Sequence, residues 1–216
     1  MTISWKSMHY IWKIYLNSVS LPNIIYVNCL KDFLKQKLEY KENTDCFTNI
    51  TSKHLPEISL FMNFWNNNIV IVEDELPENE NFYEYEINEI LNIFQSQSNN
   101  PNLIITEESI IKIIIHFFPS NVDVIDNRYI KNIKCLLWDK CDDIKDSLTK
   151  YQLDNKNNEI IDLISIDDLY LHYHLFCNLK TNNNLIVSKS FFEKYIQFNL
   201  KEFIIYEKFV DLKWLY

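Results

Sequence analysis

The sequence predicts an α+β protein, mainly helical, in which modules of two helices and a β-hairpin follow one another in tandem. Segment 87–138 has this order most clearly: an apolar helical stripe, a polar loop, a second helical pattern after the N-cap residue Thr106, and two strand-like runs that end at Trp138. A similar order recurs in 165–216 and, more loosely, near the N-terminus. A helix pair followed by a hairpin is the layout of a winged helix, so we expect tandem winged-helix-like modules.

The composition is that of a folded protein whose turns are made without glycine. The chain has 216 residues, of which 47% are hydrophobic, enough for one large domain or two to three small ones. Because Gly is absent, Asn, Asp, Ser and Lys must make the turns, and a glycine-rich phosphate-binding loop is excluded.

The charge is distributed unevenly along the chain. The net charge is −9, yet residues 1–41 contain six lysines and two acids, a balance of +4 that leaves −13 for the remainder. Contacts with phosphate groups need clustered lysine or arginine. Only the N-terminal fifth therefore has the sign expected for a nucleic-acid partner.

The first module is expected over 1–56. Apolar spacing predicts one helix over 8–19, ended by the Leu-Pro-Asn sequence that follows it, and a second over 28–38. A strand is expected over 46–50. A connecting helix and an acidic, solvated linker, together 57–82, separate this module from the next.

The second module is expected over 83–141, with its first helix over 87–94 and its hairpin strands over 122–125 and 129–137. Seven of the nine residues in 110–118 are large and apolar, so the second helix should be covered nearly all round.

The third module is expected over 165–216, after a connecting helix in 142–164. Ser165 and Asp168 form a capping-box-like start, and the last strand, 209–214, alternates in polarity. The second and third modules align part for part; the corresponding residues are Ile87 and Ile166, Thr106 and Ser188, Ile110 and Phe192, Ile114 and Ile196, Trp138 and Trp214.

The first helix of the third module is rich in tyrosine and reaches Cys177, and a Val-Ser-Lys sequence with two phenylalanines opens the second helix. This pattern resembles the winged helices that follow the helicase core in D5-like primase-helicases of large DNA viruses. The glycine-free composition, typical of AT-rich genomes, is compatible with a viral origin. No primase or helicase motif accompanies the pattern, so the resemblance implies an accessory or terminal piece of the replication machinery.

Neither a metal site nor another cofactor is expected. His172 and His174 are two residues apart on a helix and so point in roughly opposite directions. Cys135 and Cys141 have no zinc-ligand spacing, and five cysteines without a CxxC pair indicate reduced thiols. No catalytic arrangement is recognisable, so we expect that the protein is not an enzyme.

Two functions remain as expectations. The first is a nucleic-acid-associated accessory protein of replication or transcription, possibly viral, that uses the polar side of helix 28–38. Its candidate contacts are Asn28, Lys31, Lys35, Lys37 and Lys41.

The alternative is a protein–protein interaction scaffold without nucleic-acid affinity. In the second module Lys112, Ile115 and His116 lie among isoleucines, which suits a protein partner better than DNA. Aromatic residues make up 15% of the chain and are typical interface anchors unless they fill the small cores; the tryptophans in question are Trp5, Trp12 and Trp65.

No membrane partner is expected. The N-terminal segment interrupts its apolar residues with Lys, His, Asn and Ser, unlike a signal peptide, and the longest apolar run is too short to span a bilayer. The expected location is intracellular, in the cytoplasm or nucleus, or in a viral factory if the protein is viral.

Overall fold

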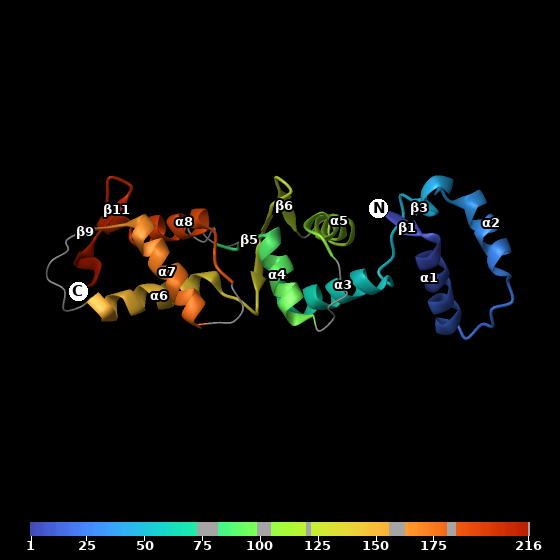
Figure 1. The fold of residues 1–216 in the computed structure, drawn as a ribbon, viewed down its shortest axis with the longest axis horizontal. Coiled ribbons are helices and arrows are strands. Elements are labelled where there is room, and N and C mark those ends of the chain that lie inside the picture. Colours follow the sequence, from blue (N-terminus) through green and yellow to red (C-terminus); the bar gives the residue numbers. More distant parts are fainter. Residues whose placement is uncertain (73–81, 99–104, 120–121, 156–162, 181–184, 216) are drawn as a thin grey trace. The chain divides into compact units, whose positions relative to one another are not determined.

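The computed structural model describes residues 1–72, 82–98, 105–119, 122–155, 163–180 and 185–215. It confirms a mainly helical α+β protein with small antiparallel sheets (Figure 1). Two compact units are present: unit 1 is Met1–Asn68 with Asn100–Asn121, and unit 2 is Ile69–Asn99 with Val122–Tyr216. The three-module organisation inferred from the sequence stays a prediction.

Unit 1 consists of four helices in its described residues and one small sheet, in which the strand order is β1-β3-β2. The elements are β1 (Thr2–Ser4), α1 (Trp5–Ser18), α2 (Val27–Lys37), β2 (Tyr40–Lys41), the 3-10 turn η1 (Glu42–Thr44), β3 (Cys46–Thr48), α3 (Pro56–Asn68) and α5 (Glu107–Phe117). Its buried core includes Phe47, Phe61, Trp65, Ile110 and Ile114.

In its described residues, unit 2 contains two three-stranded sheets, ordered β5-β7-β6 and β9-β11-β10, and the strand pair β4-β8. The strands are β4 (Ile69–Ile71), β5 (Glu84–Glu86), β6 (Asp123–Ile125), β7 (Tyr129–Lys131), β8 (Ile133–Cys135), β9 (Leu163–Ser165), β10 (Ile204–Ile205) and β11 (Phe209–Asp211). The helices are α4 (Ile87–Gln97), α6 (Lys140–Asn155), α7 (Ile166–Lys180), α8 (Lys189–Asn199) and the 3-10 turns η2 (Lys201–Phe203) and η3 (Leu212–Leu215).

One hydrogen bond recurs at the same position in all three strand-helix-helix-hairpin segments. The first residue of α1 donates its N–H to the carbonyl of the residue before β3. In the same way, the first residue of α4 donates to the residue before β7, and the first residue of α7 donates to the residue before β11. Each of these hydrogen bonds is 2.9 Å long. In each sheet the strand before the first helix pairs with the last strand of the hairpin, which is the central one. The repeated order noted in the sequence thus has a repeated backbone geometry.

The helix caps expected from the sequence are confirmed. The hydroxyl of Thr106 accepts a hydrogen bond from the Ser109 N–H over 3.2 Å, and that of Ser188 accepts one from the Phe191 N–H over 3.4 Å. Ser165 caps α7 through the Asp168 N–H over 3.0 Å. The residues matched within the second helices are fully buried, namely Ile110, Ile114, Phe192 and Ile196.

Four structural expectations are wrong. The strand expected over 129–137 is interrupted at Asn132, whose φ of 58° ends β7, and β8 then pairs with β4. The strand expected over 209–214 ends at Asp211 because η3 begins there. Helix α5 is not covered all round, since Ile115 is exposed. The expected match between Trp138 and Trp214 is also wrong, because Trp138 follows the central residue of β7 by more positions in the sequence than Trp214 follows that of β11.

The turn between β10 and β11 contains two residues in a backbone conformation that favours glycine. Tyr206 and Glu207 have φ angles of 51° and 58°, in the left-handed region that costs residues with a Cβ about 1–2 kcal/mol each. Glu207→Gly is therefore expected to raise the free energy of unfolding by about 0.5–1 kcal/mol after the entropy cost of glycine. Urea denaturation would measure it, with Glu202→Gly in the right-handed η2 as a control that should lose stability. A loss of stability in Glu207→Gly would contradict the expectation.

Candidate functional site

Two of the predicted nucleic-acid contacts, Lys31 and Lys35, form ion pairs inside unit 1. Lys31 Nζ lies 2.8 Å from Asp45 Oδ1, and Lys35 Nζ lies 2.7 Å from Glu42 Oε1. Both ammonium groups also lie near the Tyr40 ring, at 5.4 and 4.3 Å from its centroid, within cation–π range. The hydrogen bond to Asp45 raises the pKa of Lys31 to about 12. The hairpin of the same unit therefore balances these two charges.

The other three predicted contacts, Asn28, Lys37 and Lys41, are exposed. Asn28 and Lys37 lie on α2, where the side chains of Asp32 and Phe33 are exposed as well. The outward face of α2 thus mixes an acid and an aromatic ring with an amide and a lysine. It is not the continuous positive surface that phosphate contacts favour.

An exposed apolar segment lies between α1 and α2. Leu21, Ile24, Ile25 and Tyr26, which we name the apolar loop, are all exposed, with exposed fractions of 82% for Ile24 and 83% for Tyr26. Phe33 on α2 is exposed as well, and it lies four residues before Lys37 on the same helical face. Exposed apolar patches of this kind mark interaction sites. In the sequence the loop was recognisable only as the end of a helix.

The tryptophans proposed as anchors have different environments. Trp65 is buried and belongs to the core of unit 1, where its ring stacks on Phe118 at 5.3 Å between centroids. Trp5 and Trp12 are partly exposed, and the Trp5 ring stacks on His9 at 5.8 Å. Trp65 therefore fills a core and is not available as an interface anchor.

The three residues predicted for a protein interface are brought together. Lys112, Ile115 and His116 are exposed on α5 and line a hollow of about 410 Å³ with Met1 and residues 49–51. Lys112 Nζ also lies 2.5 Å from Glu108 Oε1, one helical turn earlier. This hollow adds a second candidate interaction surface to unit 1.

The ion pair at Lys31 makes a pH-dependent contribution to stability. Lys31 and Tyr40 donate hydrogen bonds to Asp45 and lower its pKa below 3.8. An acid with a lowered pKa in the folded state stabilises the fold above its unfolded pKa and loses this effect as the pH falls through the folded value. The melting temperatures of wild type and Asp45→Asn should therefore differ at pH 6, and the difference should shrink as the pH falls below the ordinary aspartate pKa of 3.8. A difference that stays constant over this range would count against the ion pair.

Unit 2 contains a buried ion pair between α6 and α4. Lys140 has an exposed fraction of only 3%, and its Nζ lies 2.9 Å from Glu89 Oε2 and 3.1 Å from the Glu84 carbonyl oxygen. The ammonium group also lies 3.8 Å from the centre of the Phe191 ring. Burial lowers the pKa of Lys140 and raises that of Glu89. Nothing in the sequence marked this pair, because its members are 51 residues apart.

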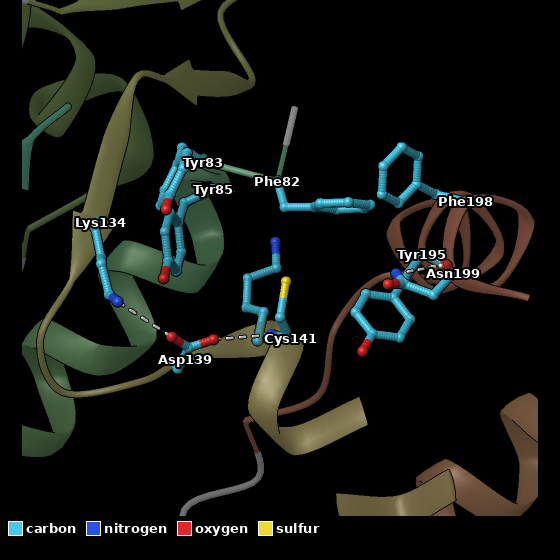
Figure 2. Close-up of a pocket in the computed structure, with 10 residues that line it drawn as sticks. Phe82, Tyr83, Tyr85, Lys134, Asp139, Cys141, Tyr195, Phe198 and Asn199 are labelled. Atoms are coloured by element: carbon cyan, nitrogen blue, oxygen red, sulfur yellow. Dashed lines mark hydrogen bonds and ion pairs between the residues drawn. The ribbon is translucent and has the colours of Figure 1, made fainter. Parts of the chain in front are cut away.

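An aromatic hollow of about 320 Å³, which we name the aromatic pocket, adjoins Lys140. Figure 2 shows the rings of Tyr83 and Tyr85 on one side and those of Phe82, Phe198 and Tyr195 on the other. The remaining lining residues are Lys134, Asp139, Lys140, Cys141 and Asn199.

Asp139 organises the polar edge of the aromatic pocket (Figure 2). Its carboxylate accepts hydrogen bonds from the N–H groups of Cys141 and Asp142 over 3.1 and 3.2 Å at the start of α6, and lies 3.4 Å from Lys134 Nζ. Burial raises the pKa of the Cys141 thiol to about 11, so the thiol stays protonated and is a poor nucleophile at neutral pH. The aromatic walls of the pocket are suited to contact with a flat apolar group.

Comparison with protein-family models, with curated proteins and with solved structures finds no match to this chain. Within the described ranges, no group of three or more His, Cys, Asp or Glu side chains is placed to hold a metal ion. A search of the same residues finds no helix with the length and apolar character needed to cross a lipid bilayer. The class that the fold defines is therefore a mainly helical α+β protein, and its function has to be inferred from its surfaces.

Proposed function

We propose that this protein is a non-catalytic, intracellular protein-interaction scaffold built from tandem winged-helix modules. The apolar loop carries the proposal: its side chains are exposed, whereas Lys31 and Lys35 are bound to acids of their own unit. Burying such a surface against a partner is favourable, and exposed aromatic and aliphatic side chains are frequent energetic centres of interfaces.

The strand order supports winged-helix modules. A winged helix has a short strand that pairs with the last strand of the hairpin, and the orders β1-β3-β2, β5-β7-β6 and β9-β11-β10 all have this form. The recurrent hydrogen bond from the first residue of the first helix to the hairpin supports the same interpretation. The middle segment departs from this arrangement in one respect, because its helix α5 belongs to unit 1 whereas α4 and the hairpin belong to unit 2.

The partner of the apolar loop should present an apolar pocket with an acidic rim. The lysines of the first module that stay exposed are Lys6, Lys13, Lys37, Lys41 and Lys53. Since these positive charges belong to the same module as the apolar loop, an acidic rim would provide charge complementarity and speed association.

A pull-down with the full chain tests the proposal. Ile24→Ser with Tyr26→Ser should lose a partner that wild type retains, because two exposed apolar anchors are removed at little cost to folding. The matched control is Leu136→Ser with Leu153→Ser, two exposed leucines of unit 2. With the purified partner, calorimetry should show binding at least about tenfold weaker for the loop variant.

Two results would contradict this assignment. Equal binding by the loop variant and the control would show that the apolar loop is not the interface. A concentration-dependent dimer in sedimentation experiments, abolished by the loop variant, would assign the loop to a second copy of the chain.

The second candidate function is that of a nucleic-acid-associated accessory protein, possibly of viral replication. The observations that favour it are the winged-helix strand order, the exposed Asn28, Lys37 and Lys41, and the resemblance of 165–216 to D5-like primase-helicases. Mobility shifts at two salt concentrations test it, because phosphate contacts weaken steeply with salt. Lys37→Glu with Lys41→Glu is the informative variant, since changing Lys31 would also break its ion pair with Asp45. Salt-independent or absent binding would exclude this function.

A further inference from the structure

We infer that the aromatic pocket of unit 2 binds one aromatic side chain of a partner protein, presented by a basic peptide segment. The pocket lies in unit 2, whereas the apolar loop belongs to unit 1, so this inference does not depend on the function proposed for the loop. A scaffold with both sites would join two different proteins.

The size of the pocket fits one large aromatic ring system. A cavity of about 150 Å³ is sufficient to hold benzene. The aromatic pocket, at about 320 Å³, is roughly twice that volume and has room for the two fused rings of tryptophan. Ring-to-ring contact of this kind contributes beyond the apolar area that is buried.

The walls of the pocket are already held in place without a ligand. The Phe82 ring contacts the rings of Phe191, Tyr195 and Phe198 at centroid distances of 5.8, 5.6 and 5.5 Å. The Tyr85 hydroxyl donates a hydrogen bond to the Trp138 carbonyl oxygen over 2.8 Å. A preformed wall lowers the entropy cost of ordering side chains when a ligand binds.

The charges around the rings disfavour a cation as the bound group. Lys140 Nζ lies 5.0 Å from the centre of the Tyr85 ring, and Lys194 Nζ lies 5.7 Å from the centre of the Phe82 ring. Both ammonium groups are paired with acids, Lys140 with Glu89 and Lys194 with Glu84, each over 2.9 Å. These ring faces therefore already have a cation beside them, and a neutral aromatic ring fits the remaining apolar walls better than a further cation.

The polar edge of the pocket offers acceptors for a ring N–H or hydroxyl group. The carboxylate of Asp139 lines the pocket, as does the exposed amide of Asn199, whose own N–H donates to the Tyr195 carbonyl oxygen over 3.0 Å. An indole N–H or a phenol hydroxyl needs such an acceptor when it is buried.

The net charge of unit 2 favours a partner in which basic residues flank the aromatic side chain. Unit 2 has 13 basic and 23 acidic residues, a net charge of −10, and the exposed Asp142 directly follows Cys141 of the pocket. A negative surface repels the phosphate backbone of a nucleic acid and attracts lysine and arginine. An aromatic side chain flanked by basic residues is thus preferred over a nucleobase.

The test uses the full chain and a fluorescein-labelled peptide with a central tryptophan flanked by lysine and glycine. Fluorescence polarisation should show saturable binding that weakens as salt is added. Replacing the tryptophan by alanine in the peptide should weaken binding about tenfold or more. Phe198→Ala in the protein should do the same, because the half-exposed Phe198 ring can be removed at little cost to the core.

Matched controls separate the pocket from general charge effects and from the apolar loop. Phe209→Ala removes a similarly exposed phenylalanine of unit 2 outside the pocket and should leave binding unchanged. Ile24→Ser with Tyr26→Ser should also bind the peptide normally, so failure of one proposal is distinguishable from failure of the other.

Three results would overturn the inference. The first is no saturable binding of the tryptophan peptide, and the second is equal binding of the tryptophan and alanine peptides. The third is tighter binding of a labelled single-stranded oligothymidine that Phe198→Ala abolishes, which would assign the pocket to nucleobases.

Discussion

Replacing Lys140 by alanine is expected to lower the free energy of unfolding of unit 2 by about 3–5 kcal/mol, because the change leaves a buried carboxylate without its counter-charge. Glu89 has an exposed fraction of 6%, and its Oε2 loses the ammonium group 2.9 Å away. The Glu84 carbonyl and the Phe191 ring lose contacts to the same ammonium group. Urea denaturation followed by circular dichroism measures the change.

Two controls distinguish loss of the charge pair from loss of a side chain. Lys140→Met combined with Glu89→Leu removes both charges and fills their volume with apolar side chains. It should cost clearly less stability than Lys140→Ala, because no buried charge is left unpaired and the losses that remain are hydrogen bonds, such as that from the Glu86 N–H to Glu89 at the start of α4. Lys145→Ala, an exposed position on the same helix, should change the free energy by less than about 0.5 kcal/mol. A loss below about 1 kcal/mol for Lys140→Ala would show that the pair is not buried as described.

Replacing Trp65 by alanine is expected to destabilise unit 1 by about 3–5 kcal/mol, the range for truncating a buried tryptophan. Trp65 has an exposed fraction of 2% and contacts the rings of Phe61 at 5.9 Å and Phe118 at 5.3 Å. Chemical denaturation with circular dichroism detection gives the free energy, because the substitution also removes a fluorophore.

The same variant tests which unit α5 belongs to. Phe118 directly follows α5, so Trp65→Ala should reduce the hydrogen-exchange protection of α5 together with that of α3. Leu60→Ala, an exposed position of α3, is the matched control and should leave both helices protected. Unchanged protection of α5 in Trp65→Ala would contradict its assignment to unit 1.

The helices of this protein were predictable because their signals are local. Apolar spacing placed α2 within one residue of its ends, and the caps at Thr106 and Ser188 marked the starts of α5 and α8. An N-cap hydroxyl and the N–H group it binds are three residues apart, so the sequence contains both partners side by side.

The short strands were not predictable in the same way. β1, β5 and β9 have three residues each, too few for alternation to be distinguished from chance, and all were missed. Each is defined by pairing with a hairpin strand more than forty residues later in the chain. The expected strand 129–137 is likewise broken because its second part, β8, pairs with β4, a strand far earlier in the chain.

The candidate binding residues show the same difference between what the sequence predicts and what the tertiary structure adds. The sequence identified Lys31 and Lys35 as lysines on one side of a helix, but the structure shows that Asp45, Glu42 and Tyr40 of the hairpin bind them. By contrast, the grouping of Lys112, Ile115 and His116 followed from helical spacing alone, and these residues are exposed together at one hollow.

By itself the amino-acid sequence determined the helical character of the chain, the ends of several helices and the helix-helix-hairpin order of the second and third segments. The physical reason is that caps, periodic apolar faces and turns connect residues within about four positions of one another. Only the tertiary structure decided which charges are buried and which apolar groups remain exposed. The Lys140–Glu89 pair, the aromatic pocket and the balanced lysines of α2 all arise where separate segments meet, and the free energy of a charge or an aromatic ring depends on those surroundings.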